Sequence, residues 1–258
     1  MEQERGGILL RLVLLAAVVV VAGGAALYWF VIRSDSPPRF ELSESPSTTA
    51  AGGTGADGAE PGGAETDGAD SASGADGTWV VLTAPRADGS VSEVGYRIGE
   101  QFARLPTPSE AVGRTPGVEG SLTIAGSTVE AVDVTADLSL LKSDKDRRDE
   151  TLQTRGLETD TFPTASFVLT EPIDLGAPPE QGQAVTAVAT GDLTLHGVTR
   201  PVEIPLDARW DGDAIEVVGQ VDVALADFSI DPPDVAGMLT VENTGELELR
   251  LFFGRSTA

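Results

Sequence analysis

The amino-acid sequence predicts an all-β domain, a sandwich or a barrel with one helical insertion, over residues 77–254. Apolar and polar residues alternate in most segments beyond Thr78, as in Val132–Leu138, Val217–Leu225 and Leu247–Phe253. This alternation indicates half-buried strands with one face toward a core. Turn sequences such as ADGS, WDGD and ENTGE separate these segments at hairpin spacing.

The helical insertion is expected over residues 144–155. Ser143 is a candidate N-cap, acidic residues follow it, and Gly156 suits the end of a helix. The chain then continues into the strand sequence TASFVLT.

Ahead of the domain, residues 12–32 form an uncharged apolar run. A helix of this length crosses about 30 Å of hydrocarbon, and Tyr28, Trp29 and Phe30 resemble the aromatic belt of a membrane interface. The small residues Ala22–Ala26 leave a cleaved signal peptide open as an alternative. We predict an uncleaved anchor, residues 1–33, in a single-pass membrane protein whose folded domain lies outside the cytoplasm.

Residues 34–76 are predicted to be a disordered linker. Their sequence is rich in glycine, alanine and acidic residues, and the stretch Ala51–Gly77 contains no large apolar side chain. Such a segment cannot bury enough apolar surface to offset its loss of conformational entropy on ordering.

Composition excludes several classes of function. The chain has 258 residues, a formal charge of -24, no cysteine and one histidine, so it cannot form a structural zinc site, and we predict no metal or cofactor site. The 17 lysines and arginines are spread too thinly for nucleic-acid binding. No nucleophile elbow, phosphate-binding loop or dinucleotide fingerprint occurs, so we predict no catalytic residue. The 41 acidic residues leave a pair of catalytic carboxylates open.

The single histidine, His196, lies in the sequence TGDLTLHGVTRPVEIPL. Leu193 and Leu195 share the apolar parity of one strand, and Val202 resumes it in the next. Gly197 can adopt a positive φ and complete a turn between them. We therefore predict that His196 lies on the solvent side beside a turn, with a catalytic base as the alternative.

Three segments resemble the YceI-like proteins. ATGDLTLHGVTRPVEIPL is similar to that family's GDLTxxGVTxPV strand signature. RRDETLQTRGLETDTFPTASFVLTEP is similar to its arginine–aspartate helix, which a phenylalanine–proline step and a strand follow. SEVGYRI, Ser92–Ile98, is a weaker match to its first strand. The segments occur in the family's order, and the resemblance covers residues 78–254.

The resemblance implies a lipocalin-like, antiparallel, eight-stranded barrel that holds a polyisoprenoid, an isoprenoid quinone or a similar lipid. Barrels of this size enclose side chains or one small ligand. The apolar parity of the strands then selects the candidate ligand-binding residues Tyr96, Ile98, Val134, Leu138, Phe167, Leu193 and Leu195. Parity does not distinguish a lipid pocket from an ordinary dry core, so both remain open.

The sequence departs from the family pattern beside the first strand, where Val91 and Glu100 stand in place of histidines. No metal role is therefore carried over to these positions. Arg148 and Asp149 match the helix motif, and we expect them to hold the helix over the barrel rather than to contact a ligand.

The leading functional hypothesis is therefore non-enzymatic binding of a lipid outside the cytoplasm. Two alternatives remain open. The first is a structural or interaction module of the cell envelope whose barrel binds no ligand. The second is an enzyme that acts on an apolar substrate through His196 or a carboxylate pair.

Overall fold

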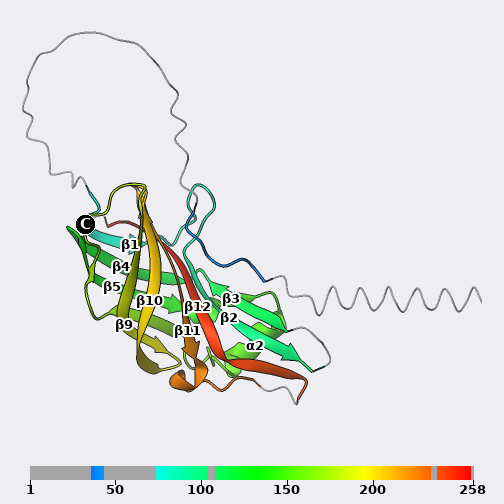
Figure 1. Ribbon diagram of the computed structural model, residues 1–258. Coiled ribbons are helices and arrows are strands. Elements are labelled where there is room, and N and C mark those ends of the chain that lie inside the picture. Colours follow the sequence, from blue (N-terminus) through cyan, green and yellow to red (C-terminus); the bar gives the residue numbers. More distant parts are fainter. Residues whose placement is uncertain (1–35, 44–73, 104–107, 234–236, 257–258) are drawn as a thin grey trace, which may run out of the picture.

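The computed structural model of the chain describes residues 36–43, 74–103, 108–233 and 237–256. Strands make up most of the regular secondary structure in this part of the chain (Figure 1). Its strands are β1 (Gly77–Val81), β2 (Glu93–Phe102), β3 (Ser109–Thr115), β4 (Val118–Ala125), β5 (Thr128–Asp137), β6 (Lys142–Ser143), β7 (Thr164–Leu169), β8 (Ile173–Asp174), β9 (Ala184–Leu195), β10 (Val198–Trp210), β11 (Ala214–Ala224) and β12 (Leu239–Arg255). Its helices are α2 (Asp146–Thr154) and the 3-10 turns η2 (Leu138–Leu140) and η3 (Leu225–Phe228).

Eight strands close into an antiparallel barrel in the order β1, β4, β5, β7, β9, β10, β11 and β12 (Figure 1). The closing pair runs from Trp79 opposite Arg255 to Val81 opposite Phe253. The predicted eight-stranded antiparallel barrel is thus confirmed. The alternating pattern determines this arrangement, because it gives each strand one apolar face, and closing the sheet turns all of these faces inward.

A small extension of the sheet lies beside one end of the barrel. The long strand β12 pairs with β1 only near its C-terminal end, and over Leu239–Arg250 it pairs with β2 instead. Strand β2 pairs with β3, and β3 pairs with the short β6. Strands β3 and β4 are separated only by Pro116 and Gly117, so the chain passes directly from this extension into the barrel.

The β9–β10 hairpin turns at His196 and Gly197, which have φ of 52° and 72°. Two successive positive φ angles are typical of a type I′ turn, whose twist suits a two-residue hairpin. The predicted turn is therefore confirmed.

The predicted helix is also present, as α2, but it begins later than expected. Lys145, not Ser143, occupies the N-cap, and Ser143 instead belongs to β6. The side-chain oxygen of Ser143 donates a hydrogen bond to Asp149 (2.7 Å), and this contact holds Ser143 outside the helix. At the other end Gly156 has a φ of 72° just beyond the C-cap, as its sequence position predicts.

The segment before the barrel is described only in part. The predicted membrane span, residues 12–32, lies outside the described residues. Within the described ranges, no helix combines the length and the apolar character needed to cross a bilayer. Residues 36–43, which we assigned to the disordered linker, lie against the outside of the barrel.

Candidate ligand cavity

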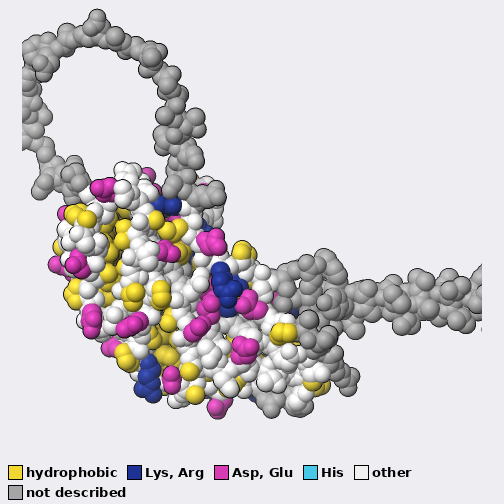
Figure 2. Space-filling view, viewed as in Figure 1, with side chains coloured by type: hydrophobic (Ala, Val, Ile, Leu, Met, Phe, Trp, Pro, Cys, Tyr) yellow, Lys and Arg dark blue, Asp and Glu magenta, His cyan; other side chains and the backbone are white. Residues whose placement is uncertain are grey.

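The barrel encloses a cavity of about 240 Å³. Its wall consists almost entirely of aliphatic and aromatic side chains, because each strand turns its apolar parity inward. Strands β5, β9, β10, β11 and β12 contribute most of these side chains, and loop residues complete the wall at both ends. In the space-filling view, hydrophobic side chains are visible along the side of the barrel formed by β4, β5, β9 and β10 (Figure 2).

Six of the seven predicted ligand-binding residues line this cavity: Tyr96, Val134, Leu138, Phe167, Leu193 and Leu195. The exception is Ile98, which is not among the lining residues although it has the same parity as Tyr96. Strand β2 continues past the barrel at this point, and Ile98 lies opposite Ala111 and Gly245, beside a bulge in β12. Strand parity alone cannot show where a strand leaves the barrel wall.

The structure adds lining residues that were not predicted. Several obey the same alternation and could have been identified from it, namely Leu122, Ile124, Val185, Ala187, Ile204, Val217, Val221 and Leu249. Others lie in loops and carry no periodic signal, namely Leu157, Leu175 and Pro179. Their contribution depends on how the loops fold over the ends of the barrel.

One end of the cavity is closed by the segment that contains α2. Leu157, just after the helix, lines the cavity. Arg148 donates two hydrogen bonds to Glu100 of β2 (3.2 and 3.0 Å) and one to Asp144. Burial lowers the pKa of Arg148, but its bonds to Glu100 and Asp144 outweigh that effect and hold the pKa above its ordinary value.

Asp149 completes this attachment by accepting hydrogen bonds from the backbone N–H and the hydroxyl of Ser143 (3.0 and 2.7 Å). Neither Arg148 nor Asp149 lines the cavity. These contacts attach the helix to β2 and β6, and a role in contacting a ligand stays untested. Glu100, which stands where the family pattern has a histidine, serves the same attachment through Arg148.

His196 is not on the solvent side, and that prediction was wrong. Only 9% of its side chain is exposed. Its Nε2 lies 2.9 Å from a carboxylate oxygen of Glu158, its Nδ1 lies 3.2 Å from the carbonyl oxygen of Phe228, and its ring packs against Phe162 at 4.3 Å. The two polar partners, Phe228 and Glu158, lie 32 and 38 positions from His196 in the sequence. The alternation within the hairpin therefore could not identify them.

The position of His196 also bears on the enzyme hypothesis. The imidazole does not line the cavity and instead joins the α2–β7 connection to η3. A side chain in this place fastens two loops at the end of the barrel and is not part of the cavity wall.

Tyr96 is a polar residue in the apolar wall. Its ring lies over Gly113, where an added Cβ would come within 2.5 Å of the ring. Its hydroxyl oxygen is buried without a hydrogen-bond partner among the described residues. Burial raises the pKa of this hydroxyl, because the phenolate would be cut off from water.

Comparison with known proteins is consistent with this geometry. The YceI-like domain model matches residues 86–253. The chain belongs to the YceI-like family. Related proteins include a UPF0312 protein of Vibrio campbellii, 32% identical over 38% of this chain and 52% of that one, and a UPF0312 protein of Shewanella denitrificans, 31% identical over 55% of this chain and 69% of that one. The chain thus spans about half the length of the first of these relatives (52%).

A solved structure has the same fold as this YceI-like domain. It is described as a polyisoprenoid binding domain from Saccharophagus degradans implicated in plant cell wall breakdown. The two structures superpose with a TM-score of 0.53 at 19% identity, over 70% of this chain and 99% of that chain.

The YceI-like match begins after two features of this chain, β1 and the segment 36–43. We call residues 36–43 the strap, because they cross the outer faces of β3, β2, β12, β11 and β10 in turn. Phe40 of the strap is 7% exposed, and the guanidinium of Arg114 lies 3.8 Å from its ring centre. This is close enough for a cation–π contact.

Beneath the strap lies a chain of buried ion pairs. Glu248 of β12 is fully buried and accepts hydrogen bonds from Arg97 (2.6 Å) and Arg114 (2.7 Å). The two arginines also donate to the carbonyl oxygens of Pro37 and Pro38 in the strap, both at 2.6 Å. The strap therefore supplies acceptors that complete the hydrogen bonding of charges it removes from water.

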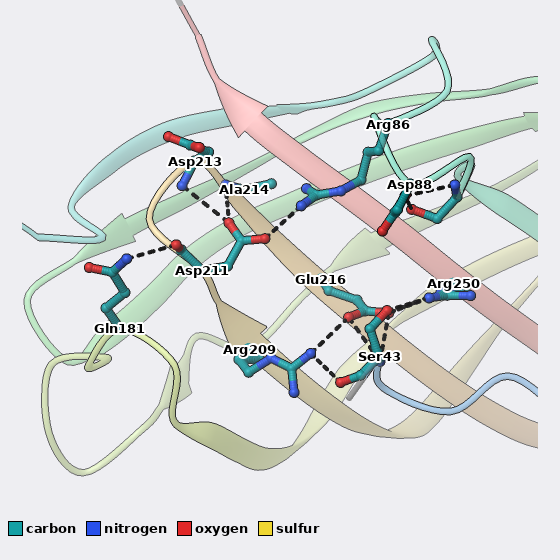
Figure 3. A network of polar contacts seen from close by, with 11 residues as sticks. Ser43, Arg86, Asp88, Gln181, Arg209, Asp211, Asp213, Ala214, Glu216 and Arg250 are labelled. Carbon is teal, nitrogen blue, oxygen red and sulfur yellow. Dashed lines mark hydrogen bonds and ion pairs between the residues drawn. The ribbon is translucent and has the colours of Figure 1, made fainter. Parts of the chain in front are cut away.

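A second buried carboxylate, Glu216 of β11, anchors the end of the strap (Figure 3). It accepts hydrogen bonds from the backbone N–H and hydroxyl of Ser43 (3.1 and 3.0 Å) and from Arg250 (2.9 Å). Arg209 bonds to both Glu216 and the carbonyl oxygen of Ser43. The polar groups of these side chains meet on the outer face of the wall, although Arg209 is also among the residues that line the cavity.

Proposed function

We propose that this protein binds a polyisoprenoid or a similar amphiphilic lipid, without catalysis, inside its barrel. The observation that carries the proposal is the apolar cavity of about 240 Å³. Burial of an apolar chain in such a wall is favourable by about 25 cal/mol for each Å² removed from water. The polyisoprenoid-binding domain of Saccharophagus degradans, which has the same fold, supports the choice of lipid.

The lining favours binding over catalysis. The charged ends of its two ionic residues, Arg209 and Glu248, bond on the outside of the wall. The histidine fastens loops outside the cavity. A barrel that serves only as a scaffold would be expected to have large side chains filling its interior, and this interior is instead hollow.

Copurified lipid tests the binding proposal. The full-length chain is purified in detergent and extracted with organic solvent, and the extract is examined by mass spectrometry. A Val217→Phe variant, which places a larger side chain in the cavity wall, is the matched control. We expect an isoprenoid lipid to be enriched with the natural chain and depleted with the variant. Equal lipid in both, or failure of the natural chain to bind added polyprenol, would contradict the proposal.

The proposed location is the outer side of a cell membrane, with residues 12–32 as the anchor. The support is the length and apolar character of that run. Because the chain has no cysteine, single cysteines introduced at Gln3 and at Ala87, in the exposed loop after β1, report topology cleanly. A membrane-impermeant thiol reagent on intact cells should label Ala87→Cys and spare Gln3→Cys. The opposite labelling would refute this orientation.

A further inference from the structure

On one side of the barrel the strand pairing is interrupted, between β7 and β8 on one edge and β9 on the other. Strand β9 pairs with β10 along its whole length, from Leu195 opposite Val198 to Ala184 opposite Arg209. With β7 it pairs only over residues 191–194. Residues 184–190 thus have a strand neighbour on one side only within the described part of the chain. We call the space beside them the side window.

The frame of the side window is continuous. At the edge where the β7–β9 pairing ends, the backbone N–H of Thr170 donates to the carbonyl oxygen of Thr190 (3.0 Å). On the far side, β8 pairs with the start of β5. At the opposite edge, the loop after β8 returns to the end of β10. There the backbone N–H of Gly182 donates to the carbonyl oxygen of Trp210 (2.7 Å), and the side-chain amide of Gln181 donates to the carbonyl oxygen of Asp211 (2.7 Å, Figure 3).

Residues of this frame line the cavity and are themselves exposed or partly exposed. Side chains from every edge of the window also line the cavity, namely Ile173, Leu175, Pro179, Gln183, Val185 and Ala187. Along β9 the inward-facing Val185 and Ala187 are partly exposed, whereas Ala189 is only 2% exposed. Exposure therefore falls from the window toward the interior.

Two apolar residues mark the outer rim of the window. Val168 of β7 is 45% exposed and Val188 of β9 is 51% exposed. The opposite end of the cavity is closed by the α2 segment, which Arg148 and His196 fasten. The side window therefore offers an apolar lipid chain an apolar path from the surface into the cavity.

Exposed acidic side chains lie on the frame of the window. Glu171, Asp174 and Glu180 are exposed on its frame. The sequence contains no lysine or arginine between Arg155 and Arg200, and neither β4 nor β5 contains one. At the edge formed by the end of β10, Arg86 and Arg209 are already paired with Asp211 and Glu216. A phosphate group held at this rim would therefore face the exposed carboxylates, whereas an uncharged head group would not be repelled.

We propose that lipid enters and leaves through the side window, and that its acidic rim selects an uncharged head group, such as an alcohol or a quinone, over a phosphorylated one. This inference rests on the proposed lipid binding and adds a route and a class of ligand to it. The apolar chain occupies the cavity, and the head group stays at the rim beside Gln183.

Cysteine accessibility tests the route, since the chain has no native thiol. In the full-length chain, Val185→Cys and Ala187→Cys should react with a water-soluble thiol reagent, and added polyprenol should protect them. Leu193→Cys, deep in the cavity, and Leu138→Cys, at the closed end, are buried controls and should react slowly. Reaction of Leu138→Cys with no reaction at either window position would overturn the route.

Two ligands of equal chain length, a polyprenol and the corresponding polyprenyl phosphate, test the selectivity. At low salt the natural chain should bind the alcohol at least about tenfold more tightly, and added salt should narrow the difference by screening the repulsion. Reversing two rim charges, Glu171→Lys with Glu180→Lys, should strengthen phosphate binding by about tenfold. Glu119→Lys, on the outside of β4, should change neither affinity.

The outcomes separate the two proposals. If the natural chain binds neither ligand, the proposed lipid binding fails. If it binds both and the phosphate is equally tight or tighter at low salt, lipid binding stands and the selectivity is overturned.

Discussion

The two faces of the β11–β12 wall have opposite chemical character. On the inner face, Val217 and Leu249 border an apolar cavity. On the outer face, Glu216 and Glu248 are buried under the strap and bonded to arginines. The same alternation of side chains produces both faces. The comparison suggests that the outer face contributes specific structure and the inner face contributes room for a ligand.

The strongest test of this division is removal of the carboxylate of Glu248. Glu248→Gln would leave the half-buried Arg114 without its counter-charge and Arg97 dependent on other ion pairs, such as that to Glu110 (2.9 Å), and we expect a loss of about 3–5 kcal/mol in the free energy of unfolding. Urea denaturation measures it. The exposed Glu119→Gln should change stability by less than about 0.5 kcal/mol. Equal losses of stability in the two variants would show that the buried ion pairs stabilise the fold no more than an exposed carboxylate does.

A smaller loss of stability is expected from the strap itself. Phe40→Ala removes a buried ring that packs under Arg114. Because the strap can detach without opening the barrel, we expect a cost of about 2 kcal/mol, below the usual range for a core phenylalanine. Hydrogen exchange should show faster exchange of the Ser43 amide, with Phe40→Leu as the milder control. Unchanged exchange would show that the ring does not hold the strap.

On the inner face, a substitution should alter binding more than stability. Val217→Phe is expected to weaken polyprenol binding by about tenfold, or 1.4 kcal/mol, since its ring takes space from the ligand. Stability should change by less than about 1 kcal/mol, because the added side chain has a cavity to enter. Val80→Phe, the same change at an outward-facing position, should leave affinity intact. Loss of affinity in both variants would point to a general disturbance.

The smallest effect at neutral pH is expected at Tyr96. Tyr96→Phe removes a buried hydroxyl that has no partner among the described residues, so stability should change by less than about 1 kcal/mol. Above about pH 10 an unfolded tyrosine loses its proton while the buried one keeps it, so the natural chain loses stability as pH rises, by up to about 1.4 kcal/mol per pH unit.

Urea denaturation at about pH 8 and about pH 11, on either side of the ordinary tyrosine pKa, checks this pH dependence. The free energy of unfolding is measured at both pH values for the natural chain and for the variant. The Tyr96→Phe variant should lose less stability between the two pH values than the natural chain. An identical loss in both would show that Tyr96 ionises as freely in the folded state as in the unfolded one.

Much of the inner face could be predicted from the sequence. Alternation identified strand faces, and six of seven predicted residues line the cavity. Ile98 does not line the cavity as predicted, because β2 continues beyond the barrel at this residue. The sequence does not show where β12 changes its partner from β1 to β2. The loop residue Leu157 gave no signal, because its contact with the cavity depends on how the α2 segment folds across the barrel end.

The outer face could not be predicted in the same way. Parity places Glu248 on the polar side of its strand but does not name Arg97, 151 positions earlier, as its partner. The strap sequence, with two prolines and a single aromatic residue, reads as part of a linker. Its order comes from bonds to strands up to 207 positions away, such as that between Ser43 and Arg250.

The sequence alone determined the alternating strands, the His196–Gly197 turn and the approximate position of the helix, because these depend on residues close together in the chain. Only the tertiary structure decided that His196 is enclosed, that the strap is docked and that β9 has an unpaired edge beside the cavity. Each of these depends on contacts between distant segments, and the closure of the barrel determines which segments meet.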